Sequence, residues 1–462
     1  MNKKDMYLDF NQDKKRGRKN KNGEFSFYKE RKGGYGWKIL LVFLLAVVLG
    51  YGGYAISKIN LTPKQQEQGQ AQNTLPPMQE NVVQITATTV PTGLVTPSPV
   101  PTNAPVEKSY PDGFMSDFVD ERTPVKAKGI YVNTKYLGRK GYATIDDLIE
   151  LCEKTELNAM VIDVKDDTGN IMFKVSNELA QEIGATTVQI PDIKEFVQKL
   201  KEKDIYLIAR VVVFKDMVLT KAKPDYAIKN PNGTIFKESN GDCWLNPYDE
   251  RVWEYVVDIA KAAVEAGFDE INFDYLRTSS ASAMDYADFG DVPEGMTRID
   301  AVTEFVKYAC SELKPMGAYV SGDVFATIIN SVSDGERIGQ SYVRLCQYLD
   351  YICPMTYPSH YSFGYAGLRY PDMYPFDILL MEMKSSVRRL SVIPETQYKA
   401  VVRPWLQDFT ASYLGNGRYI PYNAEEIRAQ ISAVYSVGYE EWLLWNAGMF
   451  YTEEAMLEQR EP

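Results

Sequence analysis

The sequence predicts a (β/α)8 barrel that follows an N-terminal membrane anchor and a linker. From residue 128 onward, short apolar segments alternate with amphipathic ones, as expected for repeated βα units. Eight segments of the first kind have seven of the second kind between them, which is the count of a closed barrel. No glycine-rich phosphate turn follows the first strand, and this disfavours the main alternative, a doubly wound open sheet.

Residues 39 to 56 form an uncharged apolar run of eighteen, long enough for a transmembrane helix of roughly 17 to 25 residues. A buried core helix is disfavoured because the run has no polar face. Residues 1 to 38 carry twelve Lys/Arg and five Asp/Glu, so the positive-inside rule predicts a basic cytoplasmic tail and an extracellular barrel. The alternative is a signal peptide cleaved after Ala55, which would make the protein secreted.

Residues 57 to 123 are predicted to be a linker. Pro, Thr and Gln make up half of the 46 residues from Asn60 to Pro105, and such a segment buries too little apolar surface to fold. As a coil it would span roughly 40 Å, enough to hold a domain away from a membrane, within or beyond a cell wall. A mucin-like or partner-binding segment is the competing interpretation. The barrel is assigned to residues 124 to 462.

Each predicted strand is a short apolar run bounded by polar or turn residues. The eight strands are expected at residues 128–134, 158–165, 205–214, 270–276, 319–326, 351–357, 399–406 and 441–448. Helices are expected between them at residues 144–156, 191–203, 249–266, 298–314, 339–349, 375–390 and 423–437, with a short tail helix over 453–459.

Charge and motif content exclude several classes of function. The net charge is -11, and the +7 of residues 1 to 38 leaves about -18 for the rest, which argues against a nucleic-acid binder. The five cysteines indicate no disulfide framework. His360 is the only histidine, which excludes metal sites with several histidines, and no nucleophile elbow or P-loop occurs. The string "DVKDDTG" lacks the full calcium-loop pattern, so neither a metal nor a cofactor is expected.

Two aspartates near strand ends are the candidate catalytic residues. Working residues of such barrels lie at the carboxyl ends of strands, where the sequence places Asp274 on strand four and Asp323 on strand five. Alternation points Asn272 and Asp274 inward, and Ser321 and Asp323 repeat the arrangement. Two such carboxyl groups can act on one bond, one as nucleophile or base and the other as proton donor. Alternatively, each aspartate has a structural role and forms a turn or a helix cap by bonding nearby backbone N–H groups.

Other polar and aromatic residues near strand ends are candidates for substrate binding. An arginine offers a fixed fork of donors, although it could equally neutralise a buried aspartate. Tyrosine and tryptophan rings can stack on the C–H face of a sugar. The predicted substrate-binding residues are Asp163, Arg210, Arg277, Tyr357, His360, Arg403, Trp405, Trp445 and Asn446.

Six ordered strings carry a family resemblance over roughly residues 127 to 450: "KGIYVN", "VIDVKDDTG", "ARVVVFKD", "DEINFDYLR", "YICPMTYPSHY" and "WLLWNAG". They resemble a family of secreted or membrane-anchored bacterial glycoside hydrolases of uncharacterised specificity with a TIM-barrel domain. The chain is more distantly similar to the α-amylase-like clan, which implies that Asp274 is the nucleophile and Asp323 the acid/base. The clan has an arginine where this chain has Asn272, and its strand-five acid is usually Glu.

The sequence therefore favours a membrane-anchored, outward-facing glycosidase that uses two carboxyl groups to cleave an extracellular or cell-wall polysaccharide. Either retention or inversion of configuration is compatible with this assignment. A non-catalytic glycan-binding barrel acting as a wall-associated scaffold is the alternative, favoured by Asn272 and by the shorter acid at Asp323. A hydrolase or lyase for another wall polymer, such as peptidoglycan, is a third hypothesis.

Overall fold

The computed structural model describes residues 108–457. The predicted basic tail, the anchor at 39–56 and the linker up to residue 107 lie outside the described residues. Among the helices that are described, none combines the length and apolar character needed to cross a membrane.

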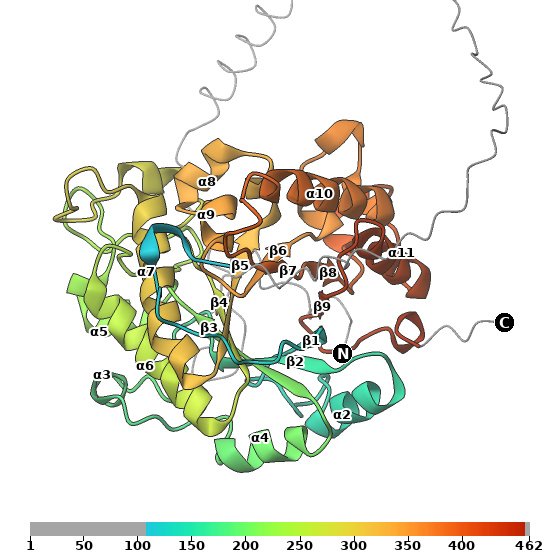
Figure 1. Ribbon diagram of the computed structural model, residues 1–462, viewed down its shortest axis with the longest axis horizontal. Coiled ribbons are helices and arrows are strands. Elements are labelled where there is room, and N and C mark those ends of the chain that lie inside the picture. The colour runs from blue at the N-terminus through green and yellow to red at the C-terminus, as the bar shows by residue number, and fades with distance from the viewer. Residues whose placement is uncertain (1–107, 458–462) are drawn as a thin grey trace, which may run out of the picture. The chain divides into compact units, whose positions relative to one another are not determined.

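Parallel strands form one closed barrel at the centre of the described part, with helices packed around the outside (Figure 1). The strand order is β5-β4-β3-β2-β1-β9-β8-β6-β7, and β5 also pairs with β6, which closes the ring. The strands are β1 (Lys128–Val132), β2 (Ala159–Lys165), β3 (Tyr206–Val212), β4 (Glu270–Asp274), β5 (Tyr319–Phe325), β6 (Tyr351–Met355), β7 (Val401–Val402), β8 (Trp405–Gln407) and β9 (Trp442–Trp445). The predicted (β/α)8 barrel is confirmed.

Strands β7 and β8 together occupy the seventh strand position of the barrel. Both pair with β6, and the break between them falls at Arg403 and Pro404. A proline has no N–H to donate to a strand ladder, which explains why the strand is interrupted there. The eight predicted strands therefore correspond to the eight strand positions of the barrel.

The helices of the described part are α2 (Ile145–Lys154), α3 (Glu178–Glu182), α4 (Ile193–Lys201), α5 (Met217–Ala222), α6 (Glu250–Ala266), α7 (Arg298–Leu313), α8 (Val332–Ile338), α9 (Tyr342–Cys346), α10 (Pro375–Leu390) and α11 (Ala424–Tyr435). Six of the seven predicted helices match an observed one. The seventh, over 339–349, is partly wrong because Gly339 has φ +83° and ends α8, so that α9 starts only at Tyr342. In the predicted tail helix, the described residues form a single 3-10 turn, Glu453–Ala455.

Part of the predicted linker lies against the barrel. Ser109 exchanges backbone hydrogen bonds with the segment before β7, and the Tyr110 ring stacks on Tyr398 with centroids 4.4 Å apart. Arg122 donates to both carboxylate oxygens of Asp350, at 2.8 and 3.1 Å. The described chain is thus attached to the amino-terminal side of β6 before β1 begins.

Local sequence signals determine where β4 begins and how closely β5 packs against the outer layer. Asp249 caps α6 by accepting from the N–H of Arg251, and Gly267, at φ +108°, ends that helix and turns the chain toward β4. In β5, a Cβ at Gly322 would come within 2.9 Å of the Leu349 side chain. Glycine is therefore required for the close approach of the outer layer beside Asp323.

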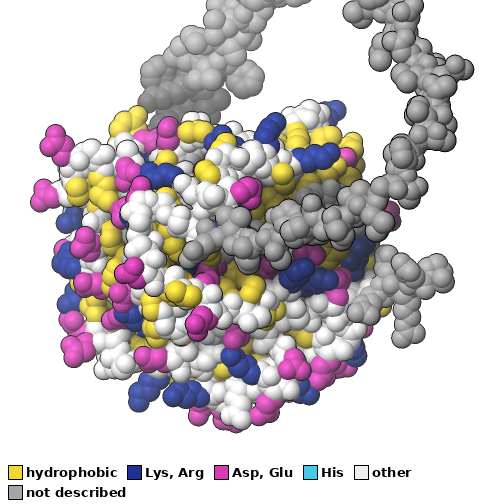
Figure 2. All heavy atoms as spheres, viewed as in Figure 1, with side chains coloured by type: hydrophobic (Ala, Val, Ile, Leu, Met, Phe, Trp, Pro, Cys, Tyr) yellow, Lys and Arg dark blue, Asp and Glu magenta, His cyan; other side chains and the backbone are white. Residues whose placement is uncertain are grey.

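Charged side chains of both signs are interspersed on the face seen in Figure 2. Typical exposed pairs are Lys199 with Asp146 and Lys203 with Glu153, and such pairs contribute about 0 to 1 kcal/mol each. Buried ion pairs behave differently, because removing one partner leaves an uncompensated charge at a cost of about 3 to 5 kcal/mol. The buried pairs of this barrel therefore matter most for its stability and for its site.

Candidate active site

A cavity of about 350 Å³ opens at the carboxyl ends of the strands, within the size range of small-molecule sites of roughly 300 to 1,000 Å³. It contains both predicted catalytic residues and six of the nine predicted binding residues. The lining residues are Arg210, Asp274, Tyr275, Arg277, Asp323, Phe325, Ala326, Thr327, Met355, Tyr357, His360, Tyr361, Trp405 and Trp445.

Asp274 is held in place by Arg210. The guanidinium donates to Asp274 Oδ2 from Nε at 3.0 Å and from Nη2 at 2.5 Å. Its Nη1 donates to Asp163 Oδ1 at 2.5 Å, so one buried arginine bridges two carboxyl groups. Because Asp163 also accepts from the Tyr131 hydroxyl at 2.5 Å, the whole group is fixed in orientation.

Arg210 lies on β3, beside the β4 position at which the α-amylase-like clan has an arginine. In the register of β3 and β4, Arg210 is the direct neighbour of Asn272. The neighbouring strand thus supplies, at the same level of the barrel, a guanidinium that contacts Asp274. The guanidinium that Asn272 cannot supply on β4 therefore comes from β3.

Asp323 lies one step beyond the last register pair of β4 and β5, Phe273 with Gly322, at the same level as Asp274. Its Oδ1 accepts from Trp405 Nε1 at 2.8 Å and from Asn272 Nδ2 at 3.0 Å. Burial raises the pKa of Asp323 well above its usual value, the charge of Asp274 raises it further, and the two donors offset only part of the rise. Asp323 is therefore suited to carry a proton.

The backbone is strained directly after Asp274. Tyr275 has φ +49°, in the left-handed region that side chains other than glycine rarely adopt. Its N–H donates to Asp274 Oδ1 at 2.5 Å, so the turn also restrains the carboxyl group. Strain of this kind, about 1 to 3 kcal/mol, is found mainly where function requires one geometry.

Aromatic rings form one wall of the cavity. Trp445 stacks on Tyr131 with centroids 4.0 Å apart and meets Trp405 edge-on at 5.7 Å. Tyr357 lies beside Trp445, and its ring meets that of His360 at 5.1 Å. His360 is exposed and lies at the rim. Flat rings next to paired carboxyl groups can bind the C–H face of a sugar.

Three predicted binding residues lie outside the cavity lining. Asp163 is one layer below it, where burial raises its pKa to about 6 despite the Arg210 charge. Asn446 orders the loop after β9, donating to the carbonyls of Asp408 and Phe450. Both are placed to support the site.

The prediction for Arg403 is wrong, because this residue lies at the opposite end of the barrel. Arg403 is fully buried, donates to Glu270 and Glu441 at 2.9 Å, and has the Tyr351 ring 3.7 Å away. Glu270 is the first residue of β4, whereas Asp274 is its last. Arg403 therefore has the role considered as the alternative, neutralising buried acids.

Sequence reasoning missed several lining residues. Phe325 is the last residue of β5, Thr327 lies just after that strand, and Tyr361 lies in the loop after β6. The rule of carboxyl-terminal strand ends applies to all three. Asn272 was expected to point inward and was noted as a departure from the clan, but its hydrogen bond to Asp323 was not predicted.

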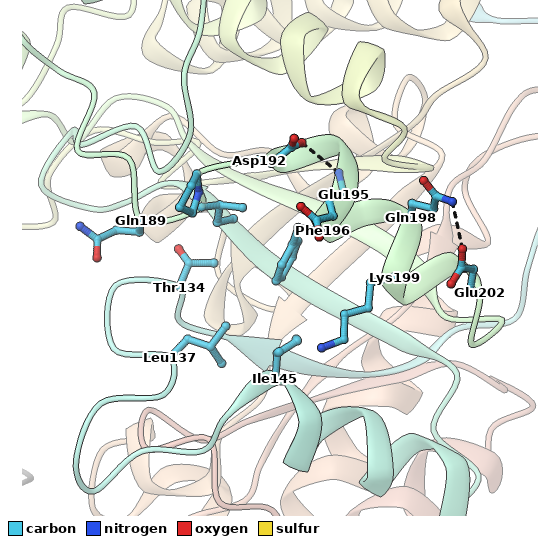
Figure 3. A pocket seen from close by; sticks show the side chains of 12 residues that line it. Thr134, Leu137, Ile145, Gln189, Asp192, Glu195, Phe196, Gln198, Lys199 and Glu202 are labelled. Carbon is cyan, nitrogen blue, oxygen red and sulfur yellow. Dashed lines mark hydrogen bonds between the residues drawn. The ribbon is translucent and has the colours of Figure 1, made fainter.

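A second hollow, of about 690 Å³, lies between α4, the loop after β1 and the start of α2 (Figure 3). Its polar groups bond to one another: Asp192 caps α4, and Gln198 donates to Glu202 at 2.9 Å. None of the predicted site residues lines it. In the part of the chain that the structure describes, no group of three or more His, Cys, Asp or Glu side chains could hold a metal ion.

A closed (β/α)8 barrel with paired acids, a bridging arginine and an aromatic wall at its carboxyl end has the architecture of a glycoside hydrolase. The sequence profile of the family described as "Putative glycosyl hydrolase domain" matches residues 129–451. The chain belongs to this family.

Solved structures of other proteins are similar to this chain. A hypothetical protein from Ruminiclostridium thermocellum is 32% identical, with a TM-score of 0.38 over 42% of this chain and 97% of that chain. The PgaB (BpsB) glycoside hydrolase domain from Bordetella bronchiseptica is 13% identical, with a TM-score of 0.51 over 71% of this chain and 95% of that chain. The second likeness supports the barrel fold. A search of curated proteins found no match.

Proposed function

We propose that this barrel hydrolyses glycosidic bonds of a polysaccharide, with Asp323 as proton donor and Asp274 as nucleophile. The observation that carries the proposal is the different environment of the two acids. Asp274 is ion-paired with Arg210, whereas Asp323 has no cationic partner within 4 Å among the described residues, and burial raises its pKa. Two neighbouring carboxyl groups with such separate environments fit one ionised and one protonated role.

In the first step, Asp323 donates its proton to the glycosidic oxygen as the bond from that oxygen to the anomeric carbon breaks. An Asp274 oxygen forms a bond to the anomeric carbon, giving a covalent glycosyl intermediate. Water then attacks this carbon, Asp323 accepts its proton, and Asp274 leaves.

Retention of configuration is favoured by register, because Asp274 and Asp323 occupy one level on neighbouring strands. Such strands lie about 4.8 Å apart, which fits the separation of about 5 to 5.5 Å used by retaining enzymes. NMR of the first-formed anomer tests this: the opposite anomer would indicate that Asp274 activates water directly.

The decisive experiment is a glycan panel assayed with the full-length chain and with Asp274→Asn and Asp323→Asn. We expect each variant to reduce kcat/KM by about 10² to 10⁴. Asp408→Asn is the matched control, since Asp408 is buried beyond the end of β8, bonds Thr452 and does not line the cavity. Binding of a glycan with no cleavage, unchanged in both variants, would instead favour the non-catalytic scaffold.

A second measurement separates the two acids. A 4-nitrophenyl glycoside has a leaving group that needs little protonation, so Asp323→Asn should lose much less activity on it than on a natural glycan. Asp274→Asn should lose activity on both. Equal losses for Asp323→Asn on the two substrates would contradict its role as proton donor.

We further propose that the chain is anchored in the cell membrane with the barrel outside, where it acts on extracellular or cell-wall polysaccharide. The apolar run at 39–56 and the basic excess before it support this orientation. Protease treatment of intact cells tests it: barrel epitopes should be degraded while an N-terminal tag is protected. Recovery of the barrel in the medium would indicate cleavage of the segment.

A further inference from the structure

Arg277 is a buried cation without a carboxylate partner. Its side chain is 9% exposed, and no acidic oxygen of the described residues lies within 4 Å of its guanidinium. The two other buried arginines each bridge two acids: Arg210 contacts Asp163 and Asp274, and Arg403 contacts Glu270 and Glu441. Arg277 is thus the exception among the buried arginines that the structure describes.

Aromatic rings surround this guanidinium in place of acids. Its central carbon lies 5.0 Å from the centroid of Trp244, 5.2 Å from Tyr275 and 4.2 Å from Phe325. Each such contact stabilises a cation only modestly, whereas burying an ion without an oppositely charged partner is strongly unfavourable. Burial lowers the pKa of Arg277, and the nearby charges of Tyr275, Asp274 and Glu238 offset only part of this fall.

Most of the hydrogen-bonding capacity of Arg277 is unused. A guanidinium has five N–H donors, and among the described residues only Nη1 makes a hydrogen bond, to the carbonyl of Thr278 at 2.9 Å. The side chain lines the cavity that also contains Asp274 and Asp323. Thr327 also lines this cavity. The free N–H donors of Arg277 can therefore donate to an acceptor atom of a ligand bound in the cavity.

We propose that Arg277 binds a singly charged acidic group on the substrate, so that the polysaccharide cleaved here contains an acidic sugar close to the scissile bond. A guanidinium matches a planar carboxylate through two parallel hydrogen bonds. The aromatic cage holds the fork in position before the substrate arrives. One arginine balances one negative charge, as on a uronic acid or a sulfate ester. This inference rests on the proposed glycosidase function, since it names the substrate of the same cavity.

The test compares matched glycans on the full-length chain. The probes are hyaluronan, polygalacturonate and alginate oligosaccharides, each beside its carboxyl-reduced form, and sulfated beside desulfated oligosaccharides. At least one acidic probe should bind about tenfold or more tightly than its neutral counterpart, a difference that calorimetry resolves. The carboxylate and sulfate arms identify which anion is bound. This comparison needs no variant.

Variants then assign the effect to one residue. Arg277→Gln should weaken binding of the acidic probe about tenfold while changing the neutral one less than about threefold. Arg277→Lys should recover part of the loss, because it keeps the charge without the fork. Arg369→Gln is the matched control: Arg369 is exposed, stacks on Tyr370 at 5.2 Å and lies outside the cavity.

Equal affinity for every acidic and neutral pair, or no binding of any acidic probe, would overturn the inference. Its failure is distinguishable from failure of the proposed function. Asp274-dependent cleavage of a neutral glycan, with no preference for acidic ones, would support the proposed glycosidase function and contradict the inference of an acidic substrate. Arg277-dependent binding of an acidic glycan that is never cleaved would support the acidic ligand and contradict the glycosidase function.

Discussion

Arg210 on β3 donates two hydrogen bonds to Asp274 on β4, at 3.0 Å from Nε and 2.5 Å from Nη2. The same guanidinium bonds Asp163, so its positive charge is shared by two buried acids. The orientation of the proposed nucleophile therefore depends on a residue from another strand, and the consequences can be measured.

Replacing Arg210 should lower the stability of the barrel. Arg210→Met leaves two buried acids unpaired, so the free energy of unfolding should fall by about 3 to 5 kcal/mol in urea titrations. Arg251→Met is the control, because Arg251 also bonds two aspartates, Asp249 and Asp225, but is exposed; its cost should be about 0 to 1 kcal/mol. Equal costs would contradict the importance of burial.

The hydrogen bond from Trp405 to Asp323 should tune the pH profile. Trp405 Nε1 lowers the pKa of Asp323 by stabilising its charged form. In Trp405→Phe this pKa should rise, so the alkaline limb of kcat/KM should move to higher pH. Trp442→Phe is the control, since Trp442 is equally buried but donates to Tyr435. An unshifted limb in Trp405→Phe would argue against Asp323 as the proton donor.

Replacing Arg403 should lower stability without changing the KM for substrate. Arg403→Met leaves Glu270 and Glu441 without their buried cation, so we expect a loss of about 3 to 5 kcal/mol in the free energy of unfolding. Assayed well below its unfolding temperature, the variant should keep KM within about twofold, because Arg403 lies at the far end of the barrel. A tenfold rise in KM would restore its predicted binding role.

Glu382 on α10 should make stability pH-dependent. It is fully buried, accepts from the Tyr365 hydroxyl at 2.5 Å, and burial raises its pKa to about 7. A carboxyl group whose pKa is higher in the folded protein stabilises it at low pH, and this contribution is lost as pH rises through about 7. Urea unfolding at several pH values should find Glu382→Gln gaining stability relative to wild type toward alkaline pH. A constant difference would contradict the prediction.

The barrel could be predicted from the order of the segments, because alternating apolar and amphipathic segments allow few other folds. The positions of Asp274 and Asp323 could also be predicted, since each lies near the end of a strand and strand alternation has a fixed period. The role of neither acid followed from its sequence position. Distinguishing them required their partners, and those partners come from β3, β4 and β8.

Residues of the same type could be distinguished only once the fold was known. Arg210, Arg277 and Arg403 all lie in or next to predicted strands. Yet Arg210 bridges acids beside the cavity, Arg277 faces it with no acidic partner among the described residues, and Arg403 lies at the opposite end. An inward side chain can belong to any layer of a barrel, and the layer depends on the stagger between strands. Stagger arises from pairing between segments distant in sequence, which is why the charge partners of each arginine became known only from the fold.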